Sequence, residues 1–223
     1  MTARGSAQDA TRAPGHSPGG QAPAPGGQAP APGFADPVFD AQHVFRVLME
    51  AMAHPASILP LESTLTPPAP LSPLAASALL TLADYETTLW LDEPAAHAPD
   101  VARFLRFHTG ARLTCDPAQA TFALITDARA LPPLETFGQG SLTYPDRSTT
   151  LVIQVDQLKP AGWTFEGPGI ETSRALTPSP RPRRFEQGWS ENHARFPQGV
   201  DVMLTAADAV AALPRSAQRT GGV

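Results

Sequence analysis

The sequence predicts a layered α/β domain built around a mixed β-sheet and preceded by a tail that has no core of its own. Short apolar segments of strand length alternate with segments in which apolar residues recur every three or four positions, so helices separate several of the strands. Residues 1–33 contain no Leu, Ile, Val, Phe, Trp or Tyr, and residues 19–32 consist of the heptad GGQAPAP twice in tandem. Because such a segment cannot bury apolar surface, we expect residues 1–33 to be disordered.

Composition also places the boundaries of the domain. Every aromatic residue and every Leu, Ile and Val lies after residue 33. We therefore expect one globular domain at 34–216, which is long enough to bury a core without disulfides or metals. A short disordered end is expected at 217–223.

The first helix is expected to begin at Asp36-Pro37, because Asp caps helices well and Pro suits the first turn. It should end before Pro55, because the residue that precedes a proline disfavours the helical conformation. Apolar residues recur along it at spacings of three and four, which predicts one buried stripe. The predicted stripe consists of Val38, Ala41, Phe45, Leu48 and Met52.

Strand, loop and helix signals then alternate up to Gly110. In chain order they are a strand at 57–61, a proline-rich loop at 67–73, a buried helix at 74–83 and a strand at 87–91. Residues 100–109 form a clear amphipathic helix that Gly110 stops. The apolar face of this helix consists of Val101, Phe104, Leu105 and His108.

The second half of the domain is richer in strand signals. The expected elements are strands at 121–126, 149–155, 163–166, 200–205 and 210–213, a short helix or turn at 132–137, a polar loop at 138–148 and a helix at 184–196. Residues 149–155 are β-branched and apolar, so they predict a central strand. Residues 163–166 are expected to pair with that strand as a hairpin and to lead into a tight turn at 167–169.

Charge and targeting signals exclude several classes of function. The formal net charge of −5 gives no electrostatic argument for nucleic acid or an anionic membrane. The longest apolar stretch, residues 74–83, is half the length needed to span a bilayer, and the first 20 residues contain no secretory signal. We therefore expect a cytoplasmic protein, and its single cysteine, Cys115, allows no internal disulfide.

No self-sufficient catalytic or cofactor motif is present. The chain contains no P-loop, GxSxG, HExxH or CxxC pattern. The single lysine, Lys159, lies in an expected hairpin connection, so a Schiff base with pyridoxal phosphate is disfavoured and no cofactor is expected. Two histidine pairs are each separated by 11 residues, which is about 16 Å along a helix and too far for one metal ion, so no metal site is expected.

Anion binding is the chemistry that the remaining polar residues favour. Arg106 and His108 lie at the end of the second amphipathic helix, although cations there also complement the helix dipole and His108 falls on the apolar face. Tyr144 and Arg147 lie in the polar loop before the central strand, where a simple turn with an internal Asp–Arg contact is the alternative. These four residues are the candidate anion-binding residues. A third cluster is the basic run of Arg181, Arg183 and Arg184, although such a run is usually a solvated face or an interface rim.

Six segments in order resemble the PhnH family, the H subunits of the carbon–phosphorus lyase core complex of phosphonate degradation. The segments are residues 45–55, 79–87, 105–111, 144–148, 167–170 and 196–201. The resemblance runs from Asp36 to Arg215 and leaves the tail outside. Ala56 stands where the family commonly has Gly, in a turn.

The resemblance implies a three-layer α/β sandwich with a central mixed sheet, similar to pyridoxal-phosphate-dependent transferases but without the cofactor. It also implies a homodimer that assembles with the G, I and J subunits. The implied function is to assist synthesis of α-D-ribose 1-methylphosphonate 5-triphosphate from ATP and methylphosphonate, with adenine displaced. The resemblance transfers no catalytic residue. A pure scaffold subunit, and a free-standing hydrolase that uses His108, are the alternatives.

Overall fold

The computed structural model describes residues 1–2 and 29–222. Most of the predicted tail, residues 3–28, lies outside the described residues. Residues 29–33 do not behave as a separate tail, because Ala31 packs against the core and its carbonyl oxygen lies 2.9 Å from Nε2 of His108. The packed part of the chain therefore begins before residue 34.

A seven-stranded mixed sheet forms the centre of the domain, in the order β1-β9-β8-β5-β4-β2-β3. Strands β3, β2, β4, β5 and β8 run parallel to one another, and β9 and β1 add an antiparallel edge beside β8. The strands are β1 (Leu59–Pro60), β2 (Thr88–Leu91), β3 (Arg112–Leu113), β4 (Phe122–Ile125), β5 (Thr150–Gln154), β8 (Asp201–Thr205) and β9 (Ala209–Leu213). The predicted mixed sheet and the central place of residues 149–155 are confirmed.

A second sheet of three antiparallel strands has the order β10-β6-β7. Its strands are β6 (Gln157–Glu166), β7 (Arg174–Ser179) and β10 (Gln218–Gly221). The predicted hairpin between residues 163–166 and the central strand is wrong, because β6 pairs with β7 and β10 instead. The expected disordered end is wrong for residues 218–221, which form β10, and exposed Lys159 lies within β6 rather than in a hairpin connection.

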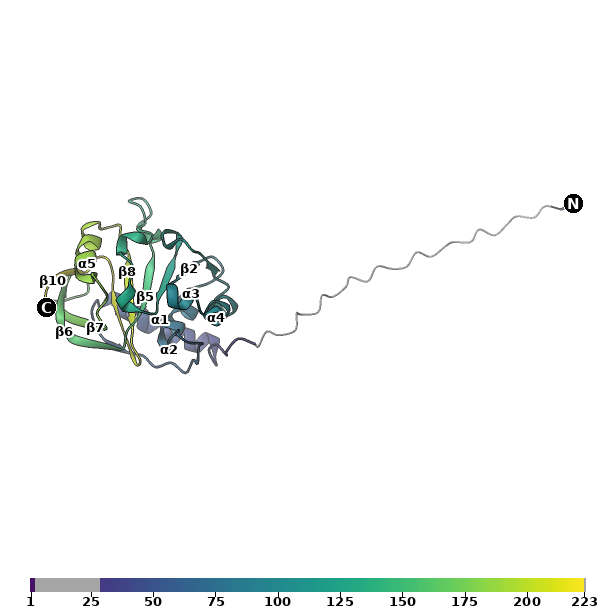
Figure 1. The fold of residues 1–223 in the computed structure, drawn as a ribbon, viewed down its shortest axis with the longest axis horizontal. Helices are drawn as coiled ribbons and strands as arrows, with labels where there is room; N and C mark the ends of the chain where they lie inside the picture. The colour runs from purple at the N-terminus through teal and green to yellow at the C-terminus, as the bar shows by residue number, and fades with distance from the viewer. Residues whose placement is uncertain (3–28, 223) are drawn as a thin grey trace.

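The helices are α1 (Pro37–Ala53), α2 (Pro73–Leu82), α3 (Glu93–Ala96), α4 (Pro99–Thr109) and α5 (Phe185–Ala194). The sheet separates two apolar cores, because alternate residues of each strand face opposite sides. One core joins α1, α2, α3 and α4 to one face, and the other joins α5 and the second sheet to the opposite face. Figure 1 shows α5, β6, β7 and β10 on one side of β5 and β8, with α3 and α4 on the other. None of the helices in the described ranges is long and apolar enough to cross a membrane.

Local sequence signals explain where the helices begin and end. The Asp36 side chain accepts hydrogen bonds from the N–H groups of Val38 and Phe39 at 3.1 Å, and Ser72 caps α2 in the same way. Gly110 ends α4 with a φ of 73°, the left-handed conformation that glycine adopts at little cost. These starts and stops confirm the predicted helices. Ala56 has a φ of 61° at the turn after α1, in the left-handed region that glycine adopts more easily than alanine.

The predicted apolar stripe of α1 is only partly buried. The fully buried residues of α1 are Val44, Leu48 and Ala51, and Val47 and Met52 pack against the core in part. Val38 and Phe45, which we expected to be buried, are 73% and 49% exposed. With Phe39 and Met49 they form an exposed apolar face, which we call the α1 face. Large apolar side chains gathered on one surface helix mark a contact surface more often than scattered ones do.

Candidate functional site

The end of α4 holds the first two predicted anion-binding residues, Arg106 and His108. Arg106 is exposed. The His108 ring packs edge-on against Phe104 and Phe107, with ring centroids 4.5 and 5.0 Å apart. Its Nε2 atom lies 2.9 Å from the carbonyl oxygen of Ala31, which makes that nitrogen a donor. The segment that precedes α1 therefore already occupies one nitrogen of the imidazole.

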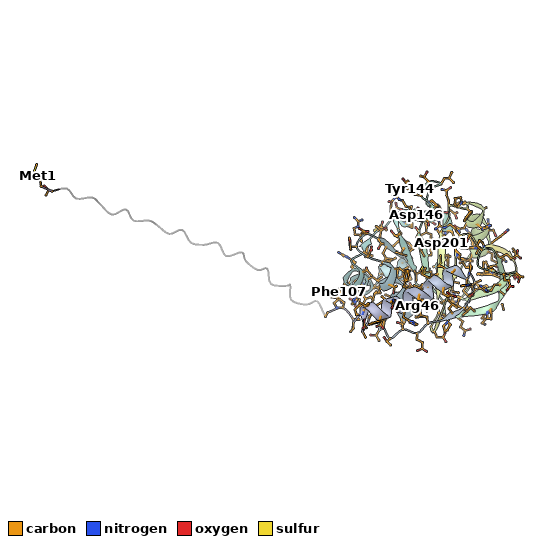
Figure 2. The ribbon with its side chains drawn as sticks, turned by 180° about the vertical axis from the view of Figure 1, so that it is seen from behind. Met1, Arg46, Phe107, Tyr144, Asp146 and Asp201 are labelled. Atoms are coloured by element: carbon orange, nitrogen blue, oxygen red, sulfur yellow. The ribbon has the colours of Figure 1, made fainter. Side chains whose placement is uncertain are left out.

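The second predicted pair, Tyr144 and Arg147, lies in an exposed loop at the amino ends of the parallel strands. The Arg147 guanidinium stacks on the Tyr144 ring, 4.3 Å from its centroid. Arg147 is thus held by the tyrosine, and not by the neighbouring Asp146 that the simple-turn alternative suggested. Figure 2 shows Tyr144 and Asp146 projecting at one end of the molecule and Phe107, the neighbour of His108, at a distant place. The structure does not bring the two pairs together, and anion binding by either pair stays a prediction.

A half-buried arginine to which the sequence analysis gave no role holds this loop on the sheet. Arg215 donates hydrogen bonds to the Asp201 carboxylate from Nε at 3.0 Å and from Nη2 at 2.5 Å. The side chain of Arg215 is 13% exposed and that of Asp201 is 15% exposed. The same guanidinium donates to the carbonyl oxygen of Pro145 at 2.6 Å and to the Ser148 hydroxyl. Asp201 pairs with Thr150 in the sheet register, so the network joins the starts of β5 and β8. We call these four residues the Arg215 network.

A cavity of about 500 Å³ lies between residues 129–135 and the start of α5. Three arginines, Arg129, Arg183 and Arg184, are among the residues that line it, and all three are exposed. We call it the arginine groove. Residue 129 lies in the short 3-10 turn η2 (Ala128–Ala130), which follows the carboxyl end of strand β4. The groove therefore adjoins the edge of a parallel sheet where ligands commonly bind in α/β folds.

The charges of the arginine groove are not balanced by protein partners. Within residues 29–222, the side chains of Arg129, Arg183 and Arg184 form neither a hydrogen bond nor an ion pair. Two carboxylates, Glu135 and Glu191, also line the cavity. The charge of the lining side chains is thus positive by one, with the carboxylates offering acceptors to a ligand.

The sequence pattern pointed to two of the three arginines of this groove. It singled out Arg183 and Arg184 as part of a basic run but gave no role to Arg129. No spacing or motif connects Arg129 with residues so distant in the chain, because only the tertiary fold brings η2 and the start of α5 to the same cavity. Within the described residues, no three His, Cys, Asp or Glu side chains lie close enough together to hold a metal ion.

Comparison with known proteins identifies the family. The model of the family described as "Bacterial phosphonate metabolism protein (PhnH)" matches residues 32–220. A protein of Rhizobium meliloti (strain 1021), alpha-D-ribose 1-methylphosphonate 5-triphosphate synthase subunit PhnH, is 41% identical over 184 residues, which cover 82% of this chain and 92% of that protein. The putative C-P lyase subunit protein HtxG of Stutzerimonas stutzeri is 32% identical over 184 residues, which cover 78% of this chain and 83% of that protein. The chain therefore belongs to the PhnH family of bacterial phosphonate metabolism proteins.

Proposed function

We propose that this chain is a subunit of the complex that makes α-D-ribose 1-methylphosphonate 5-triphosphate from ATP and methylphosphonate. In that reaction the bond between ribose C1 and adenine breaks, a phosphonate oxygen bonds to C1, and adenine leaves with a proton. The observation that carries the proposal is the 41% identity, over nearly the whole domain, to a subunit of a synthase with that product.

The role proposed for this chain is to assist the reaction rather than to perform it alone. His108, the residue on which a free-standing hydrolase would depend, packs against two phenylalanines and hydrogen bonds the carbonyl of Ala31. Tyr144 and Arg147 are stacked on each other at another place on the surface. This geometry favours an assisting subunit, with a pure scaffold as the alternative.

The proposal includes a homodimer of this chain that assembles in the cytoplasm, where ATP is supplied, with the G, I and J subunits of the carbon–phosphorus lyase core complex. The α1 face supports assembly, because Val38, Phe39, Phe45 and Met49 leave apolar surface in water on one helix. We propose that a second copy of the chain covers this face. The proposed relationship to pyridoxal-phosphate-dependent transferases is a further expectation, and it is tested by comparison of the order and direction of the strands.

Reconstitution tests the function. The G, I, J and L proteins are mixed with ATP and methylphosphonate, with and without this chain, and released adenine is measured. Adenine release should depend on the chain, and undiminished release without it would contradict the proposal. A chain that is required, but whose groove and loop variants all support full turnover, would favour the pure scaffold.

The homodimer is tested with Phe45→Glu, which places a charge on the α1 face. The variant should sediment as a monomer at concentrations where the unchanged chain is a dimer, because burying an unpaired carboxylate is costly. Leu142→Glu is the matched control, since Leu142 is also exposed but lies in the 138–148 loop. A Phe45→Glu chain that dimerises as well as the control would place the dimer contact elsewhere.

A further inference from the structure

The arginine groove has the size of a small-molecule site. Its volume of about 500 Å³ falls within the roughly 300–1,000 Å³ that ligand pockets occupy. Leu134 and Phe185 supply apolar lining, and both side chains are buried. The polar groups that line it come from two separate segments, residues 129–135 and 183–191. A cavity with an apolar floor and convergent polar walls can orient a ligand as well as bind it.

One end of the groove is suited to an oligophosphate. Arg184 occupies the N-cap position of α5, and no side chain of the described residues caps that helix. The amide groups of its first turn therefore add a positive partial charge beside the guanidinium groups of Arg183 and Arg184. Arg129 lines the cavity from the opposite wall. Guanidinium groups bind phosphate oxygens through paired hydrogen bonds, and here none is already used within the described residues.

The other end is suited to hydroxyl groups. Residues 184, 188 and 191 recur at spacings of four and three, so they share one face of α5. Gly188 leaves the middle of this face open, and a Cβ placed there would lie 3.7 Å from the Leu134 side chain. Glu191 follows beyond it and accepts a hydrogen bond from Gln187 at 2.8 Å, which leaves acceptor capacity on the carboxylate. The groove thus runs from donors at one end to acceptors at the other.

We propose that the arginine groove binds the oligophosphate ester of a ribose. The phosphates lie between Arg129, Arg183 and Arg184, and sugar hydroxyls donate to Glu191. The assignment rests on the proposed function, because the relative is named for a product that is a ribose 5-triphosphate. The guanidinium groups attract any oligophosphate, and the carboxylates add acceptors that only a ligand with sugar hydroxyls can use, so a phosphorylated sugar should bind more tightly than a plain oligophosphate.

Calorimetric titration of the purified full chain tests the site with ATP, tripolyphosphate and adenosine as probes. ATP should bind more tightly than tripolyphosphate, and adenosine should not bind. The double variant Arg129→Glu/Arg183→Glu should weaken ATP and tripolyphosphate at least about tenfold, since two charge-assisted contacts are lost. Glu191→Ala should weaken ATP alone. Arg112→Glu is the matched control, because it makes one of the same charge reversals on exposed strand β3 at the far edge of the sheet.

Three results would overturn the inference. The first is a chain that binds no ATP at millimolar concentration, and the second is an equal loss of ATP affinity in the Arg112→Glu control. The third is that ATP and tripolyphosphate bind with equal affinity and that Glu191→Ala does not change the affinity for ATP. Each variant's thermal midpoint is compared with that of the unchanged chain, so that misfolding is separated from lost contacts.

The same variants separate failure of the site from failure of the proposed function. If adenine release needs this chain, but the double variant binds ATP normally and supports full turnover, the site fails and the function stands. If the chain binds ATP through the groove, but adenine release does not need it, the function fails and the groove remains a nucleotide site.

Discussion

Arg215 and the three arginines of the groove carry the same guanidinium group in opposite surroundings. Arg215 is nearly buried, and Asp201, Ser148 and the carbonyl of Pro145 occupy its donors. Arg129, Arg183 and Arg184 line a cavity, and within the described residues their donors have no protein partner. The difference teaches that a guanidinium whose donors are used inside the protein stabilises the fold, whereas one without partners is available to a ligand.

The largest expected loss of stability comes from breaking the Arg215 network. Arg215→Ala should lower the free energy of unfolding by about 3 kcal/mol, because it leaves the Asp201 carboxylate and the Pro145 carbonyl without their donor. Urea denaturation followed by circular dichroism measures this change. Arg103→Ala is the control, since Arg103 pairs with Asp100 at 2.8 Å on the exposed surface of α4. A solvent-screened pair of this kind contributes less than about 0.5 kcal/mol, and equal losses in the two variants would contradict the structural role of Arg215.

A smaller loss of stability should come from Asn192, which joins the groove helix α5 to the residue before Asp201 of the Arg215 network. Asn192, on α5, is 2% exposed, donates to the Val200 carbonyl at 2.9 Å and accepts from the Val200 N–H at 2.8 Å. Asn192→Ala should cost about 2 kcal/mol of stability, because both buried backbone groups lose their partner. The midpoint of urea denaturation is the measurement, and Ser190→Ala on the exposed face of α5 is the control. If the two midpoints coincide, α5 is held in place by apolar packing alone.

Gly188→Ala should separate stability from binding. A methyl group at residue 188 makes only ordinary contact with Leu134, and alanine favours a helix interior over glycine by up to about 1 kcal/mol. The variant should therefore unfold at a higher urea concentration while its affinity for ATP falls severalfold, because the methyl group narrows the groove. Denaturation and calorimetry on one preparation measure both. Higher stability with unchanged ATP affinity would show that the ligand does not pass over residue 188.

The smallest expected change in stability comes from an arginine of the groove, in contrast to Arg215. Arg183→Ala should change the free energy of unfolding by less than about 0.5 kcal/mol, because within the described residues this side chain contacts no partner that would be left unsatisfied. Denaturation under the conditions used for Arg215→Ala gives the direct contrast. A loss above about 1 kcal/mol would assign Arg183 a role in the fold.

Local patterns in the sequence were enough to predict most elements. Asp36, Ser72 and Gly110 act on backbone groups within a few residues, and the helices they bound lie close to where their signals predict them. The stripe on α1 shows the limit of such patterns. Periodicity tells which apolar side chains share a face, but the packing of the whole helix decides which of them are covered, and so Val38 and Phe45 are exposed.

Strand pairing and side-chain contacts between distant segments could not be predicted from local patterns. Residues 163–166 have the composition of a strand, but their pairing with β7 and β10 depends on register and on chain ends that no local signal specifies. The same reason hid Arg215, whose partner Pro145 lies 70 residues away in the chain. Arg129 carried no motif at all.

The sequence by itself determined the α/β class, the central strand, the helix boundaries, the absence of a phosphate-binding loop motif and the resemblance to the PhnH family, because propensity, capping and motif chemistry act over short distances. The tertiary structure alone decided which strands form the second sheet, which face of α1 meets water and which arginines meet one another. Those outcomes depend on the burial and pairing of groups far apart in the chain, where the energy is set by the surroundings that folding creates.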